Sequence, residues 1–74
     1  MKSIGEELKY QRENNGFSQS EIAKETGFSQ AAISMWERGE LAPSIYACIK
    51  LANIYGITLD ELVGRDVEKT DKNI

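Results

Sequence analysis

Histidine is absent from this 74-residue sequence, and cysteine occurs once, at Cys48. These two residue types supply many of the general bases, nucleophiles and metal ligands of proteins. The sequence also lacks a glycine-rich phosphate loop after a strand and a cluster of residues at metal-ligand spacing. It therefore predicts no enzyme, no metal site and no cofactor.

Other absences limit the cellular compartments in which we expect this protein. A single cysteine cannot form an intramolecular disulfide, so nothing points to a secreted disulfide scaffold. No apolar run is long enough for a membrane-spanning helix, and residues 1–5 show no signal-peptide pattern. We expect a cytoplasmic protein without a membrane partner.

A surplus of positive charge is lacking as well. Nine Lys and Arg residues stand against twelve Asp and Glu residues, which gives a formal net charge of -3. Nucleic-acid binders usually carry a basic surplus, because phosphate neutralisation supplies most of their sequence-independent affinity. Residues 57–74 hold five acids against three bases, so two of the three surplus negative charges lie in that segment. Because the negative charge is concentrated in that segment, the net charge does not exclude a nucleic-acid partner.

What the sequence does contain is a series of helix signals. Ser/Thr-x-x-Glu capping boxes occur at Ser3, Ser18 and Thr58. Glycines suited to closing a helix follow at intervals, at Gly16, Gly27, Gly39, Gly56 and Gly64. The predicted helices are Ile4–Asn14, Ser18–Gly27, Ser29–Gly39, Ser44–Gly56 and Thr58–Gly64. Without any strand pattern, we predict an all-α, five-helix domain over residues 1–64 and a polar, flexible tail over 65–74.

Apolar spacing predicts which side of each helix faces the core. Ile33 and Trp36 lie one turn apart and are expected to point inward. Trp36 could instead stack on bases, but its periodic spacing favours the core. In the fourth helix, one apolar face is predicted to contain Ile45, Cys48, Ile49, Ala52 and Tyr55. Cys48 on that face is expected to be an inert buried thiol rather than a redox sensor.

Residues 19–38 resemble the helix-turn-helix of the phage Cro and CI repressor class, also called the Xre-like family. The resemblance rests on a small residue in the second helix, a glycine at the turn and two inward residues on the third, namely Ala23, Gly27, Ile33 and Trp36. The flanking sequences GFSQSEIA, WERG, PS and ITLDEL are also similar, so the resemblance covers residues 4–64. It implies a Cro/CI-type fold whose helix-turn-helix is formed by the second and third helices.

The family places the third helix in the DNA major groove. The resemblance therefore implies a transcriptional regulator, a repressor, that binds a pseudo-palindromic double-stranded operator as a homodimer. The implied base contacts are Ser29, Gln30, Ala31, Ser34 and Met35. Gln30 is the strongest candidate, because its amide can pair with adenine N6 and N7 together. The implied phosphate contacts are Gln19, Arg38 and Ser44.

The resemblance carries two further expectations. Arg12 and Glu37 occupy positions that the family often joins as an architectural ion pair. The dimer candidates are apolar residues that a lone domain does not obviously need inside, namely Ile54, Ile57, Leu59 and Val63. The loop Glu40–Ala42 departs from the basic loop often found in repressors, and this predicts a shallow salt dependence of DNA binding.

Two alternatives stand beside this interpretation. The polar residues of the third helix would, without the motif, be read as a solvated surface, and an outward Met35 as incidental. The acidic balance and the uncharged third helix also suit a protein-interaction module, such as an antitoxin-like subunit that uses the fold on a protein partner. An experiment that separates DNA binding from partner binding would discriminate the two functions.

Overall fold

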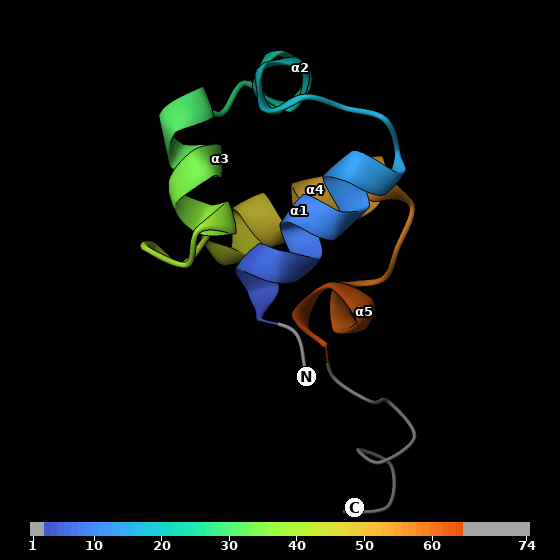
Figure 1. Ribbon diagram of the computed structural model, residues 1–74. Coiled ribbons are helices and arrows are strands. Elements are labelled where there is room, and N and C mark those ends of the chain that lie inside the picture. The colour runs from blue at the N-terminus through green and yellow to red at the C-terminus, as the bar shows by residue number, and fades with distance from the viewer. Residues whose placement is uncertain (1–2, 65–74) are drawn as a thin grey trace, which may run out of the picture.

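The computed structural model describes residues 3–64, which form five helices and, within that range, no strand (Figure 1). The helices are α1 (Ile4–Asn14), α2 (Gln19–Thr26), α3 (Gln30–Glu37), α4 (Ile45–Tyr55) and α5 (Leu59–Val63). The predicted all-α, five-helix fold is confirmed. The predicted tail, 65–74, lies outside the described residues. None of the described helices has the length and hydropathy needed to cross a membrane.

The helices begin where the capping signals predicted. At the start of α1, the Ser3 hydroxyl accepts from the Glu6 N–H at 3.1 Å, and the Glu6 carboxylate accepts from the Ser3 N–H at 3.0 Å. The other two predicted capping boxes form in the same reciprocal way, Ser18 with Glu21 and Thr58 with Glu61. Because these contacts satisfy backbone N–H groups at the helix starts, each start is fixed by residues close in sequence.

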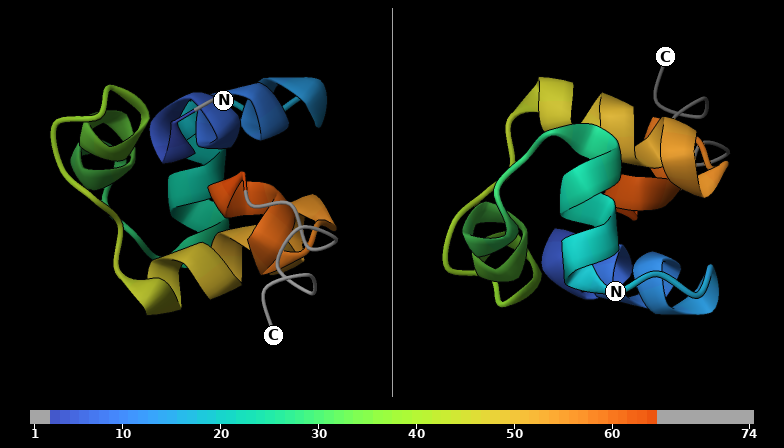
Figure 2. Two further views of the ribbon diagram at one scale, coloured as in Figure 1. Left: turned by 90° about the horizontal axis from the view of Figure 1, so that it is seen from below. Right: turned by 90° about the horizontal axis from the view of Figure 1, so that it is seen from above.

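The helices pack around one small core. α3 packs against α1 and α2, while α5 packs against α1 and α4. Figure 2 shows α3 at one edge of the domain in both views, with α5 on the other side of the helix bundle. The largest side chains that are essentially inaccessible are those of Leu8, Ile22, Leu51 and Leu62. This arrangement holds the inner side of α3 and leaves its outer side free of other described elements.

Gly5 lets α1 approach the end of α3 closely. A Cβ atom at this position would lie 2.4 Å from the Trp36 carbonyl oxygen and 2.8 Å from that of Glu37. Real Cβ atoms do not come so close to backbone oxygens, so only glycine allows this spacing without a shift. The contact places the end of α3 directly over the first turn of α1.

The prediction for α4 was partly wrong. Ile45 and Ile49 are exposed, at 58% and 44% of their surface, whereas Ala47 and Leu51 are buried in their place. Cys48, Ala52 and Tyr55 are buried as predicted. Apolar residues surround much of this helix, so spacing alone fits two overlapping faces. The small side chain of Ala47 and the longer one of Leu51 fill the space beside the core, which selects the other face.

Candidate nucleic-acid interface

The angle between α2 and α3 is set at the turn that joins them. Gly27 ends α2 in the left-handed conformation, with φ of 81°. The buried Thr26 hydroxyl donates to the Ile22 carbonyl at 2.7 Å and accepts from the Phe28 N–H at 3.1 Å. The Phe28 ring then meets the Trp36 ring edge-on, with centroids 5.3 Å apart. These contacts hold α3 from inside, as the predicted core role of Trp36 requires.

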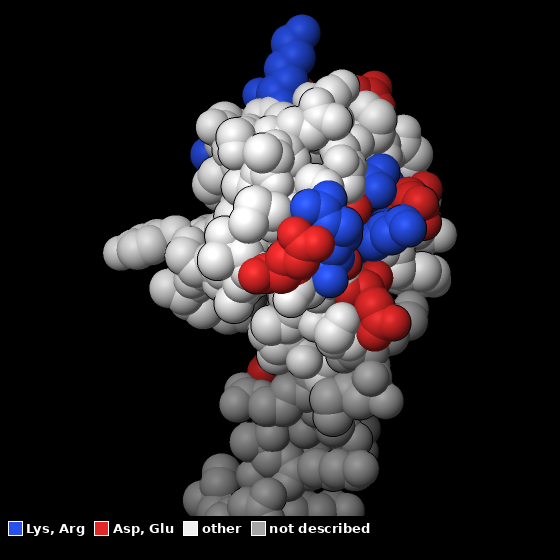
Figure 3. Space-filling view, turned by 60° about the vertical axis from the view of Figure 1, so that its left-hand side comes forward, with Lys and Arg blue, Asp and Glu red and all other residues white. Residues whose placement is uncertain are grey.

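The outer side of α3 carries short, uncharged side chains. Ser29, Gln30 and Ala31 are exposed, and Ser34 and Met35 are partly buried. The Ser29 hydroxyl caps the helix by accepting from the Ala32 N–H at 3.0 Å. Figure 3 brings the α3 side forward and shows broad areas without charge, with positive and negative side chains gathered mainly in one mixed group. The predicted base-contacting residues thus lie together on a largely neutral surface.

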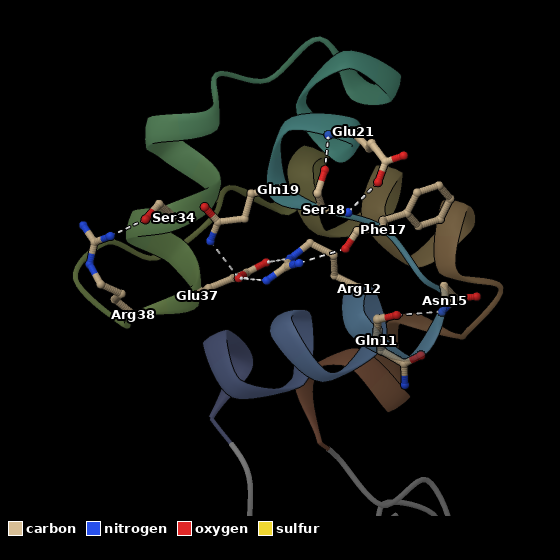
Figure 4. A network of polar contacts seen from close by, with 10 residues as sticks. All are labelled: Gln11, Arg12, Asn15, Phe17, Ser18, Gln19, Glu21, Ser34, Glu37 and Arg38. Carbon is tan, nitrogen blue, oxygen red and sulfur yellow. Dashed lines mark hydrogen bonds and ion pairs between the residues drawn. The ribbon is translucent and has the colours of Figure 1, made fainter.

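Behind this surface, Arg12 of α1 and Glu37 of α3 form the ion pair that the family resemblance implies. Arg12 Nε and Nη2 donate to the two carboxylate oxygens of Glu37 at 2.8 and 3.0 Å. Arg12 Nη1 donates to the Phe17 carbonyl at 2.8 Å (Figure 4). The side chains are only 10% and 4% exposed. The hydrogen bonds to Glu37, aided by its charge, raise the pKa of Arg12.

Gln19, a predicted phosphate contact, joins the same network. Its side-chain Nε2 donates to Glu37 Oε1 at 3.0 Å, so Glu37 links the first residue of α2 to the end of α3. Figure 4 shows Gln19 and Arg12 approaching the carboxylate from different elements. The network fixes the N-terminus of α2, whose backbone N–H groups are suited to an anion, relative to α3.

Arg38, the predicted cation for phosphate, lies just beyond α3 and is paired within the protein. Its Nε and Nη2 donate to the two carboxylate oxygens of Glu40 at 2.9 and 3.0 Å. Its Nη1 donates to the Ser34 hydroxyl. Hydrogen bonding and charge raise the pKa of Arg38 and lower the pKa of Glu40. Arg38 therefore binds both an acidic side chain, Glu40, and a second residue predicted to contact DNA, Ser34.

Ser44 lies at the start of α4, as predicted. Its hydroxyl accepts from the Ala47 N–H at 3.1 Å, so the side chain serves as the helix cap. Its neighbours Ile45 and Tyr46 are exposed, and Tyr46 exposes 81% of its surface. The hydroxyl of Ser44 keeps its own proton for donation to a further acceptor.

The dimer candidates lie between core and surface. Ile54, Ile57 and Leu59 are partly buried and pack against the core, and Val63 is partly buried. The large apolar side chains with the most exposure lie elsewhere, at Tyr10, Leu41, Ile45, Tyr46 and Ile49. The dimer surface therefore stays a prediction.

Sequence reasoning missed four contacts of the site. They are the Thr26 hydroxyl bond at the turn, the Gln19–Glu37 bond, the Arg38–Glu40 pair and the Arg38–Ser34 bond. The spacing of Ser34 and Arg38, four residues apart on one helix side, is a signal for the contact between them. The other bonds depend on how α2, α3 and the following turn are arranged in space.

Comparison with known proteins agrees with this geometry. A family model described as a helix-turn-helix matches residues 8–62. The HTH-type transcriptional regulator ImmR of Bacillus subtilis is 34% identical over 71 residues, which cover 96% of this chain and 55% of that protein. The corresponding values for PuuR of Escherichia coli, also an HTH-type transcriptional regulator, are 34% over 68 residues, 92% and 36%.

A phage protein is among the relatives as well. The cryptic phage CTXphi transcriptional repressor RstR of Vibrio cholerae is 36% identical over 70 residues, which cover 95% of this chain and 61% of that protein. The chain thus spans about one third to three fifths of the length of these three relatives. The extent of the family match and the arrangement of α2, the Gly27 turn and α3 show that this chain belongs to the Xre-like helix-turn-helix family.

Proposed function

We propose that this protein is a sequence-specific, double-stranded DNA-binding transcriptional regulator. The observation that carries the proposal is the neutral outer side of α3, held from within by Ile33 and Trp36 and presented beside the N-terminus of α2. An α-helix fits the major groove of B-DNA, where each base pair shows a distinct pattern of donors and acceptors. Membership of a family with named regulators and a phage repressor supports the same function, repression in particular.

The residues divide into two groups of DNA contacts. Gln30 lies exposed in the first turn of α3, where its amide can donate to adenine N7 and accept from adenine N6. Ala31 and Met35 offer apolar contact with thymine methyl groups, and Ser29 and Ser34 offer hydroxyls. Phosphates would be held by Gln19, Arg38 and Ser44, of which the first and last lie at helix N-termini.

The working form would be a homodimer on a pseudo-palindromic operator. A single α3 contacts few base pairs. A dimer binds two half-sites about one helical turn apart, which doubles the number of base pairs that are contacted. The partly exposed apolar residues Ile54, Ile57, Leu59 and Val63 supply the proposed dimer surface. We expect such a regulator to act in the cytoplasm.

Selection from a randomised duplex library tests this function. The folded protein should enrich one sequence family with internal two-fold symmetry, and the enriched duplex should be bound at both low and moderate salt. Gln30→Ala should weaken binding by about five- to 150-fold and relax the preference for adenine at one position, in line with the usual value of about 1–3 kcal/mol for a bidentate base contact. Failure to enrich any duplex at low salt would contradict the proposal.

A second function has one specific observation in its favour. Ile45, Tyr46 and Ile49 form an exposed apolar strip along α4, and the net charge is -3. Such a surface suits a protein partner, as in an antitoxin-like subunit. The double variant Gln30→Ala with Arg38→Glu separates the functions. Loss of DNA binding with partner binding retained supports the regulator, and the reverse result supports the interaction module.

A further inference from the structure

Arg38 is the one charged residue among the eight predicted DNA contacts. In the structure its guanidinium is already engaged on three sides, by two oxygens of Glu40 and by the Ser34 hydroxyl. A carboxylate and a phosphate both offer a guanidinium two oxygens at matching separation. Glu40 therefore occupies the same donor groups of Arg38 that a DNA phosphate would use.

The backbone brings Glu40 to this place. Gly39 adopts a φ of 76°, its N–H donates to the Trp36 carbonyl at 3.1 Å, and the Glu40 N–H donates to the Met35 carbonyl at 2.9 Å. These two bonds are the Schellman arrangement that closes a helix around a left-handed residue. The turn reverses the chain directly after Arg38, so the carboxylate two residues later faces the guanidinium.

The pair is accessible to exchange. The side chains of Arg38 and Glu40 are 53% and 54% exposed, in contrast to the buried pair behind α3. Exposed ion pairs are weak in water and are screened by salt. A phosphate that arrives at the end of α3 can thus replace the carboxylate, at the cost of leaving Glu40 unpaired beside a polyanion.

We propose that Glu40 is an intramolecular competitor for phosphate that sets the DNA affinity of this protein. In the free protein it holds Arg38 and, through Arg38, the Ser34 hydroxyl. DNA binding exchanges the carboxylate for a phosphate on the same two guanidinium nitrogens, Nε and Nη2. This role deepens the proposed function and rests on it. Its consequence is that backbone contacts contribute little affinity, so base contacts by α3 carry a larger share of the total.

The variant Glu40→Gln tests the competitor role. Two probes are used, the duplex selected by the wild-type protein and a mixed-sequence duplex of the same length. At low salt, both should be bound about two- to fivefold more tightly, the range in which exposed ion pairs operate. The slope of log affinity against log salt should become steeper by up to about 0.9, the contribution of one neutralised phosphate.

A double-variant cycle separates competition from simple repulsion of DNA by a negative charge. The gain in DNA affinity from Glu40→Gln is measured again in an Arg38→Gln background. Because residue 40 then has no guanidinium to bind, the gain should be smaller. The matched control is Glu13→Gln, which removes the same charge from an exposed position of α1. Glu13 lies eight residues, or about 12 Å of helix, beyond Gly5, where α1 meets the end of α3. This control should leave affinity nearly unchanged.

The outcomes separate the two proposals. Equal gains in the wild-type and Arg38→Gln backgrounds, or an equal gain from Glu13→Gln, would overturn the competitor role and leave the regulator function intact. Weaker binding by Glu40→Gln would also overturn it, because Glu40 would then orient Arg38 for phosphate. A wild-type protein that selects no duplex would overturn the regulator function and the competitor role together.

Discussion

Two arginine–glutamate pairs lie at the C-terminal end of α3, and their chemistry is nearly the same. In each, two guanidinium nitrogens donate to two carboxylate oxygens at 2.8 to 3.0 Å. The Arg12–Glu37 side chains are 10% and 4% exposed, and those of Arg38 and Glu40 are 53% and 54% exposed. Burial, and not the bonds themselves, therefore separates an architectural pair from one that can exchange its partner.

The buried pair also reaches further along the chain. It joins residues 25 positions apart. Arg12 also donates to the Phe17 carbonyl, and Glu37 also accepts from the Gln19 amide. The exposed pair joins residues two positions apart, next to a single turn. Loss of one buried partner leaves a charge without water or a counter-charge. Loss of one exposed partner returns the other to solvent.

The largest expected effect is on folding, from Glu37→Ala. This change leaves the buried Arg12 guanidinium without its counter-charge and should lower the free energy of unfolding by about 3–5 kcal/mol. Urea titration followed by circular dichroism measures the loss. The matched control replaces both partners, Arg12→Met with Glu37→Leu, and should be much closer to wild type. If the single variant is as stable as the double, the buried pair has no architectural role.

Tyr55, another buried residue, should influence stability at high pH. Burial raises the pKa of Tyr55 to about 12, while the nearby charges make smaller contributions of opposite sign, Glu37 raising the pKa and Arg12 lowering it. Because the unfolded tyrosine ionises near pH 10, the unfolded state holds fewer protons between pH 10 and 12, and stability falls as pH rises through that window. The loss should approach about 2–3 kcal/mol above pH 12.

Tyr55→Phe provides the control for this alkaline effect. The variant cannot ionise at residue 55, so the difference in its unfolding free energy between pH 9 and pH 12 should be smaller than that of the wild type by about 2–3 kcal/mol. Denaturant titrations at several pH values measure both proteins. An identical pH dependence would show that other groups cause the alkaline loss.

The close approach at Gly5 should produce a smaller effect with an unusual sign. At an ordinary helix position Gly→Ala adds up to about 1 kcal/mol of stability. Here the new Cβ meets the carbonyls of Trp36 and Glu37, so α1 and α3 must separate, and we expect a net loss of about 1–3 kcal/mol. Thermal denaturation measures it, with Lys9→Ala at an exposed position of the same helix as control. A stabilised Gly5→Ala protein would contradict the close contact.

The smallest effect should come from the exposed pair. Glu40→Gln should leave the thermal midpoint unchanged within error, because both side chains remain solvated with or without their partner. The same protein preparation then serves for the DNA measurements. A clear fall in the midpoint would mean that the turn after α3 depends on this pair, and the contrast between the two pairs would disappear.

Local chemistry accounts for most of what the sequence predicted correctly. The capping boxes at Ser3, Ser18 and Thr58 involve residues three positions apart, so their partners can be read directly from the sequence. The inward direction of Ile33 and Trp36 follows from helix spacing alone. Resemblance to a family supplied the Arg12–Glu37 pair, which is too distant in sequence for local rules.

The remaining features depend on packing. The buried side of α4 was misassigned at Ile45 and Ile49, because apolar residues occur around the helix and only the neighbouring elements select one face. The partner of Arg38 is set by the left-handed turn at Gly39, whose direction composition does not reveal. The bond from Gln19 to Glu37 requires the angle between α2 and α3. The residues of the site were thus easier to foresee than their partners within the protein.

Glu40, the acidic residue that follows Gly39, would influence how regulator molecules distribute between an operator and the non-cognate DNA around it. A genome offers about a million or more non-cognate sites for every operator, and these sites retain regulators chiefly through phosphate contacts. A protein in which the cation among its predicted DNA contacts, Arg38, is already occupied is retained less at each of them. If Glu40 competes as proposed, each copy leaves an incorrect site sooner, while the ratio of operator affinity to non-cognate affinity stays the same because both kinds of site lose the same phosphate contact.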